Sequence, residues 1–162
     1  MQELLNAVRA TGATNVVLAG GLNYAAALDD WLVDHPTDKL NQLGASWHAY
    51  PAYGTAFGTP AEAQPNFAPQ IFTQALGILN ANIPVIITEI GDNCAAGTPD
   101  SPEVTNMTTW ADANGVSVLG WGWNTWTTVG ATSCEDVLIL NSGGTPTPGY
   151  GVVFHDWLVN HK

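Results

Sequence analysis

A single carboxylate ends the most strand-like segment of this sequence. The segment Pro84–Gly91 reads Pro-Val-Ile-Ile-Thr-Glu-Ile-Gly, so Glu89 follows a run of β-branched residues that favour strands. A near-continuous apolar run is typical of a parallel strand covered on both faces, and α/β folds place their chemistry at the carboxyl ends of such strands. The chain has only three Lys and Arg residues, which disfavours a salt-bridge role. We therefore interpret Glu89 as a functional carboxylate rather than as a helix cap.

A histidine and a tyrosine come two residues apart in another strand-like segment, Ser46-Trp47-His48-Ala49-Tyr50-Pro51. Residues two apart on a strand share a face, so His48 and Tyr50 are expected to point the same way. Taken alone, Tyr50 is better explained as a core residue and His48 as a satisfied internal histidine. Both at a strand end, with Glu89 ending the next strand, favour a site.

Tryptophans dominate the last strand-like segment, Gly120-Trp121-Gly122-Trp123-Asn124-Thr125-Trp126. Trp121 and Trp123 are expected to share a face, with Trp121 packed in the core. A tryptophan at a strand end near carboxylates makes a flat apolar platform, suited to the C–H face of a sugar ring. Trp123 is the candidate for that platform, and Asn124 and Trp126 are candidates for further substrate contacts.

Strand-like and helix-like segments alternate along the chain, which predicts βαβ units, a parallel sheet and right-handed crossovers. The expected strands are Asn15–Ala19, Ala45–Tyr50, Val85–Glu89 and Val116–Trp123. The expected helices are Gln2–Ala10, Pro69–Asn80, Pro102–Ala113 and Tyr150–Asn160. The segments after the strands are long and those before them are short, which is the polarity of α/β barrels with their sites on the βα loops. Residues 1–162 read as a single domain.

Composition restricts the partners and the compartment of the protein. Hydrophobic residues make up 46% of the chain, charged residues 10%, and the formal net charge is -11. This charge excludes nucleic acid and anionic lipid as partners, because both require clusters of Lys and Arg. No apolar run approaches the roughly 20 residues that span a membrane. The low share of charged residues and the many Trp, Asn, Thr and Gly residues are typical of secreted enzymes, although Met1–Leu5 does not begin a signal peptide.

Two cysteines, Cys94 and Cys134, are present. In an oxidising compartment they are expected to pair as a disulfide. The alternative is two unrelated buried thiols.

Three of these segments resemble, in order and separation, landmarks of glycoside hydrolase family 5, the cellulase family of retaining (β/α)8 barrels. The resemblance implies that Glu89 corresponds to the nucleophile at the end of the seventh strand. It also matches His48 and Tyr50 to the His-x-Tyr of the sixth strand, and Trp123 to the Trp that ends the eighth. It covers nearly the whole chain, as the last four βα units of such a barrel. It implies a β-glucan or a related polysaccharide as the substrate, and no metal or cofactor.

The chain departs from the family pattern at the acid/base residue. In the family this glutamate follows an Asn at the end of the fourth strand, and this sequence has no Asn-Glu pair. Retaining hydrolysis needs two carboxyl groups roughly 5–5.5 Å apart. The remaining glutamates in loops or at a helix start, Glu62, Glu103 and Glu135, have nothing that recommends them for this role.

The sequence therefore predicts an α/β fold that is a (βα)4 half of a TIM (β/α)8 barrel, with four parallel strands and flanking helices. A complete barrel usually needs about 250 residues. Four strands alone leave two open edges, so we expect two copies to associate into a closed barrel as a homo-oligomer. The expected function is a cellulase-type endo-β-1,4-glucanase half that carries the nucleophile and lacks the acid, with weak or association-dependent hydrolysis. The alternatives are a non-catalytic carbohydrate-binding half-barrel and a structural module.

Overall fold

Four parallel strands form one sheet, in which the spatial order equals the order along the chain. The computed structural model describes residues 1–50, 69–91, 101–125 and 137–161. The strands are β1 (Val17–Gly20), β2 (Leu43–Ala49), β3 (Val85–Ile90) and β4 (Ser117–Gly120), paired β1-β2-β3-β4. This order is that of consecutive βα units, as the sequence predicted.

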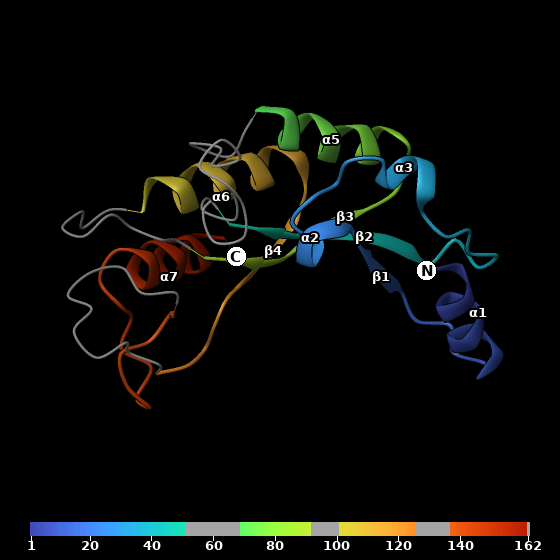
Figure 1. Ribbon diagram of the computed structural model, residues 1–162. Coiled ribbons are helices and arrows are strands. Elements are labelled where there is room, and N and C mark those ends of the chain that lie inside the picture. The colour runs from blue at the N-terminus through green and yellow to red at the C-terminus, as the bar shows by residue number, and fades with distance from the viewer. Residues whose placement is uncertain (51–68, 92–100, 126–136, 162) are drawn as a thin grey trace.

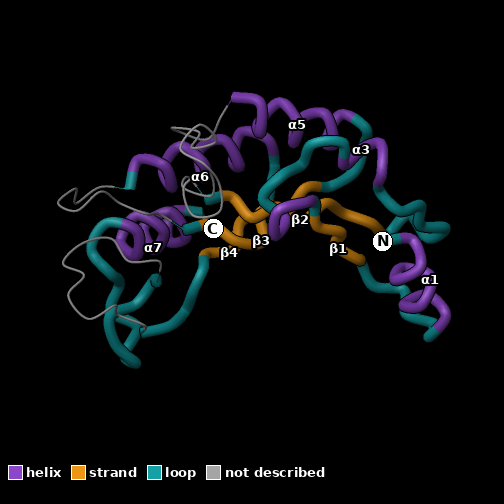
Figure 2. Tube along the Cα trace, in the orientation of Figure 1, coloured by secondary structure: helices purple, strands orange, loops and turns teal. Residues whose placement is uncertain are grey.

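Helices cover one face of this sheet (Figures 1 and 2). The helices are α1 (Gln2–Ala10), α2 (Leu22–Ala25), α3 (Trp31–Asp34), α5 (Pro69–Asn80), α6 (Pro102–Asn114) and α7 (Tyr150–Asn160). Helices α5 and α6 lie over the sheet, α1 lies beside the β1 edge, and α7 lies beside β4. The prediction of a (βα)4 half-barrel is confirmed. Within the described residues, no helix is long and apolar enough to cross a bilayer.

Alternation along the strands separates a buried face from an open face. In β2, Trp47 is fully buried and its ring packs edge-on against Phe72 and Trp110, with centroid distances of 6.2 and 5.9 Å. The neighbouring residues Ser46 and His48 are only partly buried, because their side chains point to the opposite face. In a closed barrel that second face would line the interior, so the half-barrel leaves it open.

The fourth strand is shorter than the sequence predicted, ending at Gly120 rather than at Trp123. The carbonyl of Gly122 accepts hydrogen bonds from the backbone N–H of Asn124 and Leu138, at 2.7 and 3.1 Å, instead of extending the ladder. Trp121 continues the alternation of β4, in which Val118 is buried and Leu119 is exposed, so it lies on the open face of the sheet. The prediction that Trp121 lies in the core is wrong: its side chain is 46% exposed.

The short helices α2 and α3 were not predicted, and they occupy the segment between β1 and β2. Within α2, the backbone of Asn23, Tyr24 and Ala25 has positive φ angles of 51°, 56° and 63°. Such angles are uncommon for residues other than glycine. The three residues are Asn, Tyr and Ala, so their types do not indicate this turn in the sequence.

An ion pair ties α1 to the segment that precedes β2. The Arg9 guanidinium donates to both carboxylate oxygens of Asp38, with Nε–Oδ1 and Nη2–Oδ2 distances of 3.0 and 2.8 Å. Asp38 also accepts from the backbone N–H of Gln42 at 3.0 Å. The Arg9 hydrogen bonds, with help from the backbone of Gln42 and Leu40, lower the pKa of the Asp38 carboxyl to about 2.

Candidate active site

A tyrosine and a glutamate from neighbouring strands meet at the carboxyl end of the sheet. Tyr50, directly after β2, donates a hydrogen bond from its hydroxyl to Oε2 of Glu89 in β3, over 3.0 Å. The phenol thus fixes the orientation of the carboxylate. Tyr50 and Glu89 were both predicted as site residues, and the structure brings them together.

His48 faces the other oxygen of the same carboxylate. Its Nε2 lies 3.6 Å from Oε1 of Glu89, and the two side chains are 22% and 24% exposed. His48 and Glu89 are also direct partners in the parallel pairing of β2 and β3. The carboxylate therefore has one oxygen held by a phenol and the other beside an imidazole, at a partly open position. This arrangement suits a carboxylate that attacks or stabilises an electrophilic carbon.

Gly91 makes room for the tyrosine ring. A Cβ atom at position 91 would lie 2.5 Å from Cε1 of Tyr50, so only glycine allows the ring to rest where it does. The sequence motif Glu-Ile-Gly thus supplies both the carboxylate and the space for its hydrogen-bond donor.

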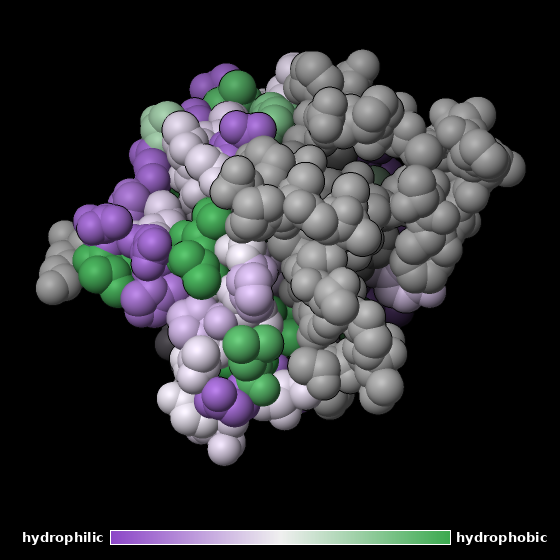
Figure 3. All heavy atoms as spheres, turned by 90° about the vertical axis from the view of Figure 1, so that its left-hand side faces the viewer, coloured by the Kyte–Doolittle hydropathy of each residue, from purple (hydrophilic) through white to green (hydrophobic). Residues whose placement is uncertain are grey.

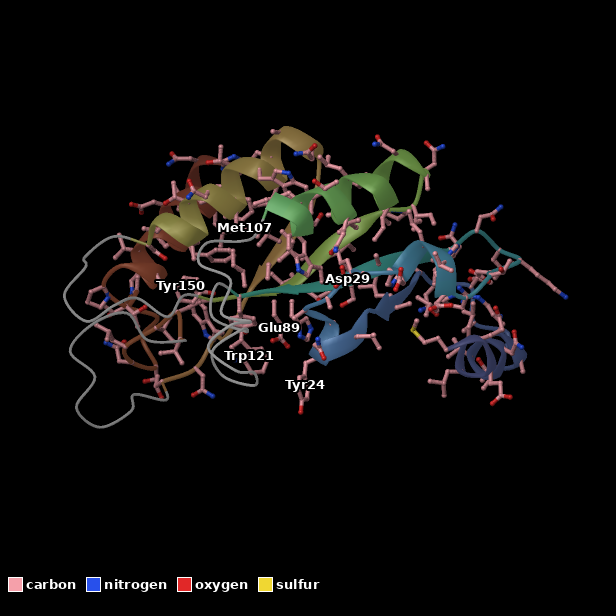
Figure 4. The ribbon with its side chains drawn as sticks, turned by 45° about the horizontal axis from the view of Figure 1, so that its top comes forward. Tyr24, Asp29, Glu89, Met107, Trp121 and Tyr150 are labelled. Carbon is pink, nitrogen blue, oxygen red and sulfur yellow. The ribbon has the colours of Figure 1, made fainter. Side chains whose placement is uncertain are left out.

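Trp121 lies next to β3 at the same end of the sheet. Its backbone N–H donates to the carbonyl of Ile90 over 2.9 Å, and Ile90 directly follows Glu89. In Figure 4, Glu89 and Trp121 lie on the side of the sheet opposite to Met107, a fully buried residue of α6. Trp121 was expected in the core, so sequence reasoning missed it as a site candidate.

A hollow of about 250 Å³ adjoins this end of β4. It is lined by Gly120, Trp121, Gly122, Trp123, Asn124 and Val137. Trp123 is 73% exposed, and one edge of its ring lies 3.4 Å from the position of a Cβ at Gly144. Asn124 is half-buried, and its side-chain oxygen accepts from the backbone N–H of Thr125 at 2.6 Å. The predicted residues Trp123 and Asn124 thus line one concave surface with Trp121.

Three predicted residues, Trp126, Cys94 and Cys134, lie outside the described residues. The expectations of a substrate contact and of a disulfide therefore stay predictions. Sequence reasoning also missed Ser46 and Thr88, whose hydroxyl oxygens lie 2.6 Å apart beneath the site. The sequence offered one indication of their role: Ser46 comes two residues before His48, and Thr88 comes one residue before Glu89.

Comparison with known proteins identifies the class. The sequence model of the cellulase family, glycosyl hydrolase family 5, matches residues 1–126. The chain therefore belongs to this family, as the resemblance implied. No curated protein sequence matches the chain.

Solved structures of three bacterial enzymes share the fold. An endo-β-1,4-glucanase from Xanthomonas axonopodis pv. citri is 17% identical with a TM-score of 0.66, covering 96% of this chain and 52% of its own. A β-glucanase from Saccharophagus degradans is 18% identical with a TM-score of 0.67, covering 99% and 46%. The mannanase catalytic domain of Streptomyces sp. SirexAA-E is 18% identical with a TM-score of 0.62, covering 89% and 42%. The chain thus spans about half the length of these relatives.

Proposed function

We propose that this chain is a half-barrel of a retaining β-1,4-glucanase in which Glu89 is the nucleophile. The observation that carries the proposal is the hydrogen bond from Tyr50 to Glu89 at the carboxyl ends of adjacent parallel strands. Enzymes of α/β barrels build their sites at this end. The Saccharophagus β-glucanase has also been solved in complex with cellotetraose, which supports a β-glucan as the substrate class.

The proposed reaction starts with attack of a Glu89 oxygen on the anomeric carbon. A bond forms between this oxygen and the carbon, and the bond from the carbon to the leaving oxygen breaks with its electron pair. Tyr50 keeps the carboxylate of Glu89 aligned. His48 lies near the position of the missing acid or contacts the hydroxyls of the sugar. Trp121 and Trp123 offer apolar ring faces for the sugar in the adjoining hollow.

The chain carries no recognisable acid/base residue, because the family's Asn-Glu pair is absent from its sequence. General acid help is typically worth about 10²–10⁴-fold. We therefore propose that hydrolysis of natural β-glucan by this chain is weak, or depends on association with a chain that supplies the acid.

Closure by a second copy is the association that we propose. Strands β1 and β4 end the sheet with unpaired edges among the described residues, and the open face carries Leu18 and Leu119, which are 39% and 56% exposed. Pairing β4 of each copy with β1 of the other would close eight parallel strands. Each 162-residue chain would then act as one half-barrel domain.

A substrate with a very good leaving group tests the nucleophile apart from the missing acid. Dinitrophenolate leaves without protonation, so 2,4-dinitrophenyl β-cellobioside needs only the nucleophile for the first step. We expect a burst of dinitrophenolate equal to one per chain, followed by slow turnover, which is the fingerprint of a covalent intermediate. Azide, which attacks the intermediate without a general base, should accelerate the turnover.

Matched variants decide the assignment. Glu89→Gln should abolish the burst, while Glu3→Gln, at an exposed position of α1, should retain it. Mass spectrometry should locate one cellobiosyl group on the peptide that contains Glu89. A burst that survives in Glu89→Gln, or its absence in the unaltered protein, would overturn the proposed role.

A non-catalytic carbohydrate-binding half-barrel is the second candidate. The hollow beside Trp121 and the exposed ring of Trp123 favour it, because neither feature needs a second carboxylate. Saturable binding of cellotetraose without a dinitrophenolate burst would support this candidate over the first.

We also propose that the protein is secreted, because so few of its residues are charged. Only 10% of the residues are charged. Pairing of Cys94 with Cys134 would agree with an oxidising compartment.

A further inference from the structure

The pairing of β2 with β3 contains a bulge immediately before Glu89. Trp47 pairs with Ile87 and His48 pairs with Glu89, so Thr88 is an extra residue on β3 that has no partner in the register. A bulge places two residues of one strand opposite a single residue of its neighbour. The bulge therefore shifts every residue after Thr88 by one position.

This shift decides which face of the sheet carries the carboxylate. Ile87 is fully buried under the helices, so strict alternation would put Thr88 on the open face and Glu89 toward the helices. With the bulge, Glu89 lies on the open face beside His48, and Ile90 returns to the core, where it is fully buried. Without the bulge the carboxylate would point into the hydrophobic layer.

The side chain of the extra residue is held by the neighbouring strand. The hydroxyl oxygens of Thr88 and Ser46 lie 2.6 Å apart, and the Thr88 hydroxyl also donates to the carbonyl of Trp47 over 3.4 Å. Both contacts are partly buried, where hydrogen bonds lose less to competition with water. Ser46 lies on the open face of β2, one residue before Trp47, after which the register shifts.

The chain after the bulge is held by a second set of contacts. The carbonyl of Ile90 accepts hydrogen bonds from the hydroxyl of Tyr150 and from the backbone N–H of Trp121. Glu89 therefore lies between two held points, the Thr88 hydroxyl before it and the Ile90 carbonyl after it.

We propose that the Ser46–Thr88 hydroxyl pair is a positioning element for Glu89, because it holds the bulge that turns this carboxylate toward Tyr50 and His48. The pair acts through the backbone of β3 and does not touch the substrate. The inference rests on the proposed function only for its catalytic consequence, since the orientation of Glu89 can be measured in the absence of any reaction.

The Tyr50–Glu89 hydrogen bond reports the orientation directly. The protein has four tyrosines, and ¹³C labelling at Cζ gives each a signal that responds to hydrogen bonding at its hydroxyl. Loss of one signal in Tyr50→Phe assigns the Tyr50 resonance. In Glu89→Ala the Tyr50 hydroxyl has lost its acceptor, so the chemical shift of the Tyr50 resonance in this variant marks the state without the hydrogen bond.

Removing either hydroxyl should move the Tyr50 signal toward the Glu89→Ala position. Thr88→Val keeps the β-branched shape and removes only the hydroxyl, and Ser46→Ala removes the other partner. The double variant should move the signal no further than the single variants, because the pair acts as one unit. Thr88→Ser, which keeps the hydroxyl, should leave the signal near its original position.

Thr108→Val is the matched control. Thr108 is buried in α6, where its hydroxyl donates to the carbonyl of Val104 over 2.8 Å. Thr108→Val therefore removes a comparable hydrogen bond within α6 rather than at the bulge, and it should leave the Tyr50 signal in place. A signal that stays in place in both Thr88→Val and Ser46→Ala, while Glu89→Ala moves it, would overturn the proposal. If Thr88→Val fails to fold by circular dichroism, Ser46→Ala alone decides.

The dinitrophenyl cellobioside burst supplies the catalytic readout. Misplacement of a reacting group by about 1 Å can cost about 10²-fold in rate. We expect Thr88→Val to slow the burst by up to about that factor with little change in the concentration that gives half-maximal rate. If the unaltered protein shows no burst, the proposed function is refuted. The Tyr50 signal alone then tests whether the hydroxyl pair positions Glu89. A burst of unchanged rate in Thr88→Val would refute the positioning role alone.

Discussion

The ring of Tyr50 rests against the Cα of Gly91, in space that a larger residue would fill. A Cβ at position 91 would lie 2.5 Å from Cε1 and 3.1 Å from Cδ1 of that ring. Real Cβ atoms do not approach ring carbons so closely, so the ring would have to move. The same strand end therefore provides the carboxylate of Glu89 and the room for the phenol that holds it.

Gly91→Ala should displace the Tyr50 ring and loosen its hydrogen bond to Glu89. We expect a slower dinitrophenolate burst, by up to about 10²-fold, because the carboxylate loses its fixed orientation. Gly77→Ala in α5 is the control, since among the described residues its Cβ would meet only Leu32 Cδ1, at an ordinary 3.7 Å. Equal burst rates in the two variants would contradict the role given to Tyr50.

Trp121→Ala and Trp123→Ala should each weaken the binding of cellotetraose, because each removes a ring that lines the hollow beside β4. An aromatic contact of about 1 kcal/mol corresponds to roughly a fivefold rise in the dissociation constant. Isothermal titration calorimetry can measure it. Leu158→Ala removes an exposed apolar side chain of α7 outside the hollow and should leave the affinity unchanged. Unaltered binding in both tryptophan variants would place the sugar elsewhere.

The protein should form dimers whose stability rises with salt. Each chain carries a formal charge of -11, so two copies repel each other and added salt screens this repulsion. Light scattering at micromolar concentration should give at least twice the chain mass of 17.1 kDa. A monomer at every salt concentration, with a cooperative melting transition, would show that the open face needs no second copy.

The Arg9–Asp38 pair should make the free energy of unfolding fall in acid. The pKa of Asp38 is lowered from 3.8 to about 2, mainly by the Arg9 hydrogen bonds, so the unfolded chain binds a proton at this group more readily. Its stabilising contribution is present above about pH 4 and is lost as the pH falls through about 2.

Asp38→Asn should be less stable at neutral pH and should lose this part of the acid dependence. Urea unfolding at a series of pH values measures both effects. Asp34→Asn, at an exposed carboxylate of α3, is the control. Identical acid profiles for Asp38→Asn and the unaltered protein would contradict the assignment.

Cys94 and Cys134 should form a disulfide when the protein is made in an oxidising compartment. They follow β3 and β4 in the sequence, so the bridge would link the segments after two adjacent strands. Such a bridge stabilises by roughly 2–4 kcal/mol in chain-entropy estimates. Thiol titration of the unfolded, unreduced protein should find no free thiol, and two free thiols per chain would refute the bridge.

The regular elements could be predicted because their periods are local properties of the sequence. Helices α1, α5 and α7 begin and end at the residues expected from the sequence. Strand β3 was predicted to end at Glu89 and ends one residue later. Proline before the third strand and glycine after it marked its limits.

The finer placement of the site residues depends on contacts that no local pattern encodes. The bulge at Thr88 arises from the pairing of two strands, and a period-2 reading of β3 alone would put Glu89 on the wrong face. Trp121 is exposed because it lies on the open face of the sheet, like Leu119 two residues before it, and the half-barrel leaves that face uncovered. Gly120 between them contacts Phe154 on the other face: a Cβ there would lie 2.7 Å from Cε1. Both features are tertiary, and both lie next to the candidate catalytic carboxylate.

The consecutive order β1-β2-β3-β4 has a consequence for synthesis on the ribosome. Each strand pairs with the strand made just before it, so no pairing has to wait for a distant part of the chain. Loop closure between such neighbours costs less entropy than closure between remote segments. The sheet can therefore grow one βα unit at a time as the polypeptide emerges, and each new strand finds the edge of the strand before it already in place.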